Sequence, residues 1–148
     1  MNQRQRIVAC ARHFIDVRFI HQGRSINGLD CLGLLLATAT HAGLVFEGVH
    51  TRAIAVPDYG LRPDVTLLKS KLDYFLVPIS PAEILPADIV LLKVNGSPQH
   101  LAILSDYPMA DEVAMVHAYA PARKVVEHRY DLAWRKATYA AYRLPQLV

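Results

Sequence analysis

The chain has 148 residues, of which 53% are hydrophobic, and its formal net charge at neutral pH is +3. This length and composition predict one globular domain spanning residues 1–148, with a core that needs no disulfide framework. The basic residues are scattered, so no nucleic-acid partner is expected, and two cysteines are too few for a disulfide scaffold.

The N-terminal stretch MNQRQRIVACARHF carries charges inside its apolar segment, which is not the pattern of a secretory signal. No apolar run approaches the roughly 18 residues of a membrane span. We therefore expect cytoplasmic synthesis without a signal peptide, and no membrane span.

Three helices are predicted in the first half of the chain. The first carries apolar residues at i, i+3, i+4, i+7 and i+8, and its stripe places Cys10 in the core: Ile7, Cys10, Ala11, Phe14 and Ile15. Residues 31–42 are apolar almost all round, with Asp30 as N-cap and Gly43 as C-cap, which predicts a buried second helix. Residues 44–63 contain glycine and proline and predict an irregular connection before a third helical stripe at 65–76.

Short β-prone runs follow the prolines at 78, 81 and 86. They read DIVLLKV, HLAILS, EVAMVHAY, KVVEH and ATYAAYR, and the dipeptide Asn95-Gly96 joins the first two as a hairpin. Helices that precede strands predict an α+β domain, in which N-terminal helices pack on an antiparallel five-stranded sheet.

Cys31 is the candidate nucleophile, because it lies in the first turn of the second predicted helix. The positive end of the helix dipole and nearby unpaired N–H groups favour a thiolate. The adjacent Asp30 opposes this effect, so full activation requires a stronger partner such as a protonated imidazole.

A predicted hairpin brings two histidines together. If Ser105 faces Glu112 across a loop of residues 106–111, His100 lies directly opposite His117. The same face carries four apolar residues, which predicts that it is the face covered by the helices: Ala102, Leu104, Val113 and Met115.

This arrangement fits a nucleophile, a base and an orienting group, as in cysteine acyl transfer. His100 would take the thiol proton, His117 would hold the other ring nitrogen of His100, and the backbone N–H of Cys31 would donate to the oxyanion.

Other interpretations of these residues remain open. One alternative is that Cys31 is a small residue of the core. Another is that the two histidines and Cys31 are three ligands of a zinc site, whose fourth ligand is not evident. Asp88 fits local hydrogen bonding at the start of a strand. The remaining histidines are expected to be structural or surface residues: His13, His21, His41, His50 and His128.

The segments GLDCLGLL, PADIVLLKV, QHLAILSD, AMVHAY and RKVVEH together resemble the NlpC-type papain-like cysteine peptidases, which hydrolyse peptide bonds in bacterial peptidoglycan. The resemblance covers residues 16–143 and places Cys31, His100 and His117 at the three catalytic positions. It implies a papain-like fold and cleavage between D-glutamyl and diamino-acid residues of the stem peptide. No metal or organic cofactor is implied.

The lead-in FIHQGRSINGLDC is most similar to the branch found in phage and prophage tail proteins and gene-transfer particles. The resemblance therefore implies a virion- or tail-associated protein, with peptidoglycan stem peptides and other phage tail proteins as partners. Residues 64–76 would be an insertion that shapes the cleft. Two alternatives stay open: an intracellular thiol amidase or acyltransferase on the same fold, and a structural tail-assembly protein with an idle site.

Two positions depart from the family pattern. Leu32 stands where many members have serine, and Phe19 stands where many have a tyrosine that donates to the oxyanion. His21 or Gln22 is the candidate for this second oxyanion donor, or for a contact with substrate.

Overall fold

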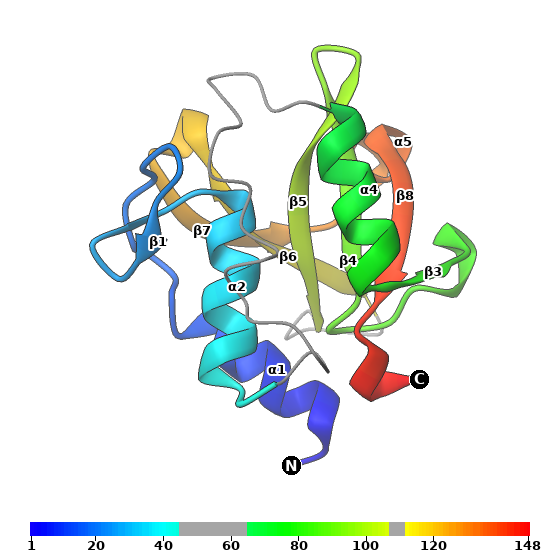
Figure 1. Ribbon diagram of the computed structural model, residues 1–148, viewed down its shortest axis with the longest axis horizontal. Coiled ribbons are helices and arrows are strands. Elements are labelled where there is room, and N and C mark those ends of the chain that lie inside the picture. The colour runs from blue at the N-terminus through cyan, green and yellow to red at the C-terminus, as the bar shows by residue number, and fades with distance from the viewer. Residues whose placement is uncertain (45–64, 107–111) are drawn as a thin grey trace.

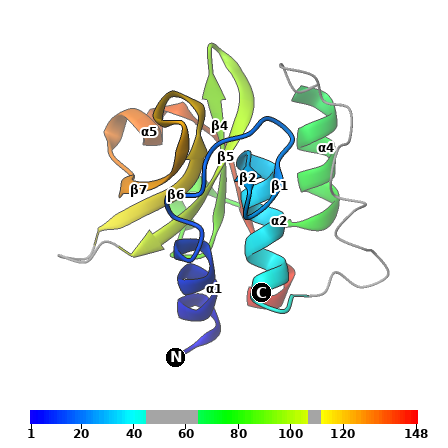
Figure 2. The same cartoon turned by 90° about the vertical axis from the view of Figure 1, so that its left-hand side faces the viewer.

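A computed structural model describes residues 1–44, 65–106 and 112–148 of the chain. One antiparallel sheet of six strands forms the centre of the fold. Helices α1, α2 and α4 lie on one side of this sheet, and the short helix α5 lies on the other (Figures 1 and 2). The α+β fold class is therefore confirmed. The predicted irregular connection at 44–63 falls outside the described residues, apart from Leu44.

The three predicted helices are present, as α1 (Gln3–Arg12), α2 (Cys31–His41) and α4 (Val65–Phe75). Helix α1 ends before Phe14, which is buried in the following turn, so the apolar spacing overestimates the length of this helix. Gly43 follows α2 with φ at 71°, the left-handed conformation in which glycine commonly ends helices.

The sheet has the strand order β3-β8-β4-β5-β6-β7. Its strands are β3 (Val77–Ile79), β4 (Ile89–Val94), β5 (Ser97–Asp106), β6 (Val113–Tyr119), β7 (Lys124–Arg129) and β8 (Thr138–Arg143). A separate small hairpin joins β1 (Arg24–Ser25) to β2 (Gly28–Leu29), and α5 spans Leu132–Ala137. Short 3₁₀ turns cover Pro81–Glu83, Ala120–Ala122 and Pro145–Leu147.

The prediction of five strands missed β3. This strand contains Pro78 and lies at the edge of the sheet, where it pairs with β8 and where a missing backbone N–H is tolerated. Helix α5 was also missed, because six residues are too few to show a helical period.

Both faces of the sheet are buried. Leu101, Ile103 and Val116 pack with the helices α1, α2 and α4 in one core. Ala102, Leu104 and Met115 pack in a second core on the opposite face, against Trp134 of α5. The prediction that the second set faces the N-terminal helices is wrong, because apolar residues occupy both sides of these strands.

The predicted register between β5 and β6 is wrong by two residues. Ser105 pairs with Ala114 rather than Glu112, and the strands continue to the pair Asp106 and Val113. A shift of two residues leaves every side chain on its face, so the alternating pattern cannot distinguish the two registers. His100 and His117 therefore share a face, as expected, but are not directly opposite.

Asp88 connects distant parts of the fold. Its side chain is fully buried and accepts one local hydrogen bond, from the N–H of Leu85. It also binds Arg4 of α1 at 3.1 Å and Arg143 of β8 at 2.8 Å. The predicted local hydrogen bond is present, and the carboxylate also joins a helix to a strand, which the sequence did not indicate. Within the described segments, no helix is long and apolar enough to cross a membrane.

Candidate active site

Asp30 fixes the start of α2, the helix that begins at Cys31. One oxygen of this buried carboxylate accepts the N–H of Gly33 at 2.8 Å and a hydrogen bond from Arg24 at 2.6 Å. The other oxygen accepts the backbone N–H of Gln22 at 2.9 Å. The loop before the helix is thereby attached to the helix N-terminus, and Cys31 is held at its tip.

Gly33 lets the loop approach this helix closely. A Cβ atom at Gly33 would collide with the backbone carbonyl of Gly23. The same carbonyl accepts a hydrogen bond from Arg24 at 2.9 Å. The GLDCLG sequence therefore has a steric reason for its second glycine, which costs helix propensity of up to about 1 kcal/mol.

The thiol of Cys31 lies against the backbone of Leu101, the residue that follows His100 in β5. The backbone groups of Leu104 bond toward β4, to Asp88 and Ala87. Because backbone groups alternate along a strand, those of Leu101 point the other way, toward β6.

The described β5–β6 pairs begin at Ile103 and Val116 and do not include Leu101. The described pairing of the two strands ends before this point, and the backbone of Leu101 interacts with the thiol of Cys31. We call this point between β5 and β6 the seam.

His100 and His117 meet at the seam. Nε2 of His100 lies 2.7 Å from Nδ1 of His117, and both residues are buried. Extending the register would place Tyr119 opposite His100, so the two imidazoles form a diagonal pair. The structure brings the two histidines into contact and the Cys31 thiol to the neighbouring residue of the same strand.

A third histidine extends this pair. Nε2 of His117 lies 2.7 Å from Nε2 of His128 in β7, and Nδ1 of His128 lies 2.9 Å from the carbonyl oxygen of Arg129. Sequence reasoning counted His128 among the structural or surface histidines. The signal in the sequence that could have pointed to His128 is the alternation of side chains in KVVEHR. This alternation places His128 on the face of His117 only once the register between β6 and β7 is known.

Burial controls the ionisation of these groups. Desolvation, and secondarily the charge of Asp30, raises the pKa of Cys31 to about 12. Desolvation lowers the pKa of His100 to about 4, and desolvation with the neighbouring histidines lowers the pKa of His117 to about 2. The resting site at neutral pH therefore holds a neutral thiol and two neutral imidazoles. Burial opposes the helix-end effect, which alone would favour the thiolate.

The other sequence candidates lie in the loop before α2. The backbone N–H of Gln22 is engaged by Asp30, which removes that group from the possible oxyanion donors. His21 lies in the same turn and is partly buried. Phe19 packs against the first core, and its backbone N–H donates to the carbonyl of Arg123. Across the described ranges, no group of three or more His, Cys, Asp or Glu side chains is arranged to hold a metal ion.

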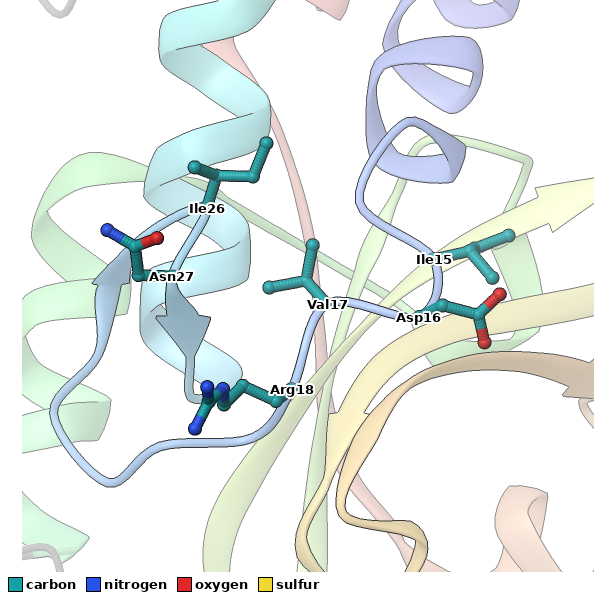
Figure 3. Close-up of a pocket in the computed structure, with 6 residues that line it drawn as sticks. All are labelled: Ile15, Asp16, Val17, Arg18, Ile26 and Asn27. Atoms are coloured by element: carbon teal, nitrogen blue, oxygen red, sulfur yellow. The ribbon is translucent and has the colours of Figure 1, made fainter.

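A pocket of about 470 Å³ lies between the segment after α1 and the tip of the β1–β2 hairpin (Figure 3). Its lining residues are Ile15, Asp16, Val17, Arg18, Ile26 and Asn27. None of Cys31, His100 and His117 lines it.

No protein-family model matches the sequence. No curated protein matches it either. Solved structures do match the fold. An NLP/P60 family protein of Staphylococcus aureus, described as similar to lipoprotein, superposes with a TM-score of 0.63 at 17% identity, over 96% of this chain and 41% of its own.

Two further structures share the fold. The NlpC/p60 domain of the peptidoglycan hydrolase SagA gives a TM-score of 0.60 at 20% identity, over 97% of this chain and 100% of its own. The peptidoglycan hydrolase RipB of Mycobacterium tuberculosis gives 0.64 at 16% identity, over 95% of this chain and 64% of its own. The chain spans less than half of the S. aureus protein. It therefore has the papain-like α+β fold of the NlpC/P60 domains.

Proposed function

We propose that this chain is a cysteine peptidase that hydrolyses amide bonds in the stem peptides of bacterial peptidoglycan. The observations that carry the proposal are the hydrogen bond between His100 and His117 and the contact of the Cys31 thiol with the backbone of Leu101, the residue after His100. Cys31 is the nucleophile, His100 is the base and His117 orients His100.

The neutral resting state defines the first step. Because Nε2 of His100 is engaged by His117, Nδ1 is the nitrogen that remains for the thiol proton. As the sulfur attacks the amide carbonyl, the S–C bond forms and the proton passes to His100. The backbone N–H of Cys31 is one of the first N–H groups of α2, which have no acceptor within the helix, and it donates to the oxyanion.

The second half of the reaction returns the site to its starting state. His100 gives its proton to the leaving amine as the C–N bond breaks, which leaves a thioester on Cys31. Water then loses a proton to His100 and attacks the thioester, and the departing sulfur recovers that proton. His21 or the side chain of Gln22 supplies the second contact to the oxyanion or to the substrate.

The solved structures with this fold support peptidoglycan as the substrate. SagA and RipB, which share the fold, are both named peptidoglycan hydrolases. A separate proposal concerns location: the segment FIHQGRSINGLDC supports a place in a phage or prophage tail, and other tail proteins would then be partners. Cleavage between the D-glutamyl and diamino-acid residues remains part of this proposal.

The test is digestion of purified muropeptides by the full chain, with new amines identified by mass spectrometry. Cys31→Ala and His100→Ala should each abolish release, whereas Cys10→Ala, on the buried face of α1, should retain it. Turnover of lipids or small amides with inert muropeptides would favour an intracellular amidase or acyltransferase instead. Loss of activity on chelation would favour the zinc interpretation. Unchanged infectivity and wall digestion by particles carrying Cys31→Ala would favour a structural role.

A further inference from the structure

The three histidines form a continuous hydrogen-bonded chain that ends on the protein backbone. The chain runs from His100 through His117 to His128, with contacts of 2.7 Å and 2.7 Å, and then to the carbonyl oxygen of Arg129 at 2.9 Å. A carbonyl oxygen only accepts hydrogen bonds. The last contact therefore requires a proton on Nδ1 of His128.

When His128 is uncharged, that requirement determines the direction of the other two bonds in the chain. An uncharged His128 with a proton on Nδ1 offers a bare Nε2, which must accept the N–H at Nε2 of His117. His117 then has a bare Nδ1, which must accept the N–H at Nε2 of His100. His100 is left with a bare Nδ1, the nitrogen that can take a proton from a thiol.

The reverse direction needs an extra charge. For His117 to accept from His128, His128 would carry protons on both ring nitrogens, because the Arg129 carbonyl still requires one of them. His117 would then donate through Nδ1, and His100 would carry its proton on Nδ1. In that state His100 could not accept the thiol proton.

The surroundings keep the two inner rings neutral and in place. Burial lowers the pKa of His100 to about 4 and that of His117 to about 2, so neither ring carries a charge at neutral pH. The indole of Trp134 lies against His117 and His128, with ring centroids 5.2 Å and 5.5 Å away. The ring of Tyr119 lies 4.9 Å from His117.

We infer that His128 is a positioning residue, which selects the catalytically competent tautomer of His100 through His117 by anchoring the chain to the Arg129 carbonyl. This inference rests on the proposed function of Cys31 and His100. His128 sits two rings away from His100, so it acts through His117 and not on the substrate.

The decisive test measures tautomers directly and needs no activity. In two-bond ¹H–¹⁵N spectra of the ¹⁵N-labelled full chain near pH 7.5, His100 and His117 should be protonated on Nε2, and His128 on Nδ1. A proton on Nδ1 of His100, or two protons on His128, would overturn the inference even if muropeptides are cleaved. If muropeptides are not cleaved but the tautomers are as stated, the proposed reaction fails and the tautomer chain stands.

Variants at His128 connect the tautomer to the rate. His128→Leu removes the acceptor, so His100 should show mixed tautomers and kcat should fall about tenfold with little change in KM. His128→Gln supplies a carbonyl oxygen to His117 and an amide N–H to Arg129, and should recover most of that loss. His13→Leu, at an exposed position after α1, is the matched control. Equal kcat and an unchanged His100 tautomer in His128→Leu would contradict the inference.

Discussion

Nε2 of His100 lies 2.7 Å from Nδ1 of His117, across a point where their two strands no longer pair. The side chains therefore bridge a gap that the backbone leaves open. The thiol of Cys31 enters the same gap at Leu101. Burial of these groups determines how the site responds to pH, and the loop before α2 determines where the sulfur lies.

The free energy of unfolding should fall as the pH is lowered from about 6.5 toward 4. Burial places the pKa values of His100 and His117 below 6.5, so the unfolded chain binds protons that the native chain excludes. The free energy of unfolding therefore keeps its full value above pH 6.5, where both states leave the histidines neutral. Below pH 6.5 it falls by at most about 1.4 kcal/mol per pH unit for each histidine.

Urea unfolding at several pH values checks this slope. His117→Gln cannot take up a proton and should give a shallower slope, whereas His13→Gln, at an exposed site, should follow the wild type. Parallel curves for the wild type and His117→Gln would show that the buried imidazole is not excluded from protonation.

Asp30→Asn should make Cys31 more reactive toward iodoacetamide at pH 8. The charge of Asp30 raises the pKa of the thiol, while Arg24 lowers it, so removing the carboxylate charge shifts the pKa downward. Asparagine can still accept the N–H of Gly33, which keeps the helix cap. Each unit of decrease raises the thiolate fraction about tenfold.

The alkylation rate of Cys31 is measured by peptide mass spectrometry. Asp131→Asn, the equivalent cap substitution on α5, is the control and should leave the rate unchanged. The buried Cys10 should stay unlabelled in every variant. A rate in Asp30→Asn equal to that of the wild type would show that burial alone sets the thiol pKa.

Gly33→Ala should destabilise the protein by about 1–3 kcal/mol, because the new methyl group meets the carbonyl of Gly23. This sign opposes the usual stabilisation of up to about 1 kcal/mol when alanine replaces glycine inside a helix. Thr40→Ala, at an exposed position of α2, is the control and should change stability by only a few tenths. Thermal or urea unfolding distinguishes the outcomes, and a more stable Gly33→Ala variant would refute the steric role.

Asp88→Ala should cost about 3–5 kcal/mol in the free energy of unfolding, because it leaves two partly buried arginines without their carboxylate. Glu112→Ala removes an ion pair with Arg129 in which both side chains are about half exposed. That control should cost less than about 1 kcal/mol. If both variants lose the same stability in urea unfolding, Asp88 is not the link between α1 and β8 that its contacts indicate.

Local patterns in the sequence predicted the elements well. The cap at Asp30, the turn at Asn95-Gly96 and the periodic apolar stripes correspond to observed elements, because each depends on neighbouring residues. Alternation also placed His100 and His117 on one face of the sheet. Pairing of these two histidines was therefore predictable even with a register in error by two residues.

Tertiary features of the site were beyond these patterns. The sequence could not tell which face of the sheet α1, α2 and α4 cover, because Leu101 and Ala102 point to opposite faces and are both apolar and buried. His128 could be found only through the pairing of β7 with β6. Desolvation of Cys31 depends on packing, which the helix-end argument does not include.

The acceptor that ends the histidine chain is a peptide carbonyl, and every amino acid at position 129 carries one. The side chain at position 129 therefore takes no part in the hydrogen bond that fixes the proton order two strands away. The histidine chain thus ends on a backbone group that is present whenever the strand β7 forms. A comparison of side chains alone would miss this carbonyl group.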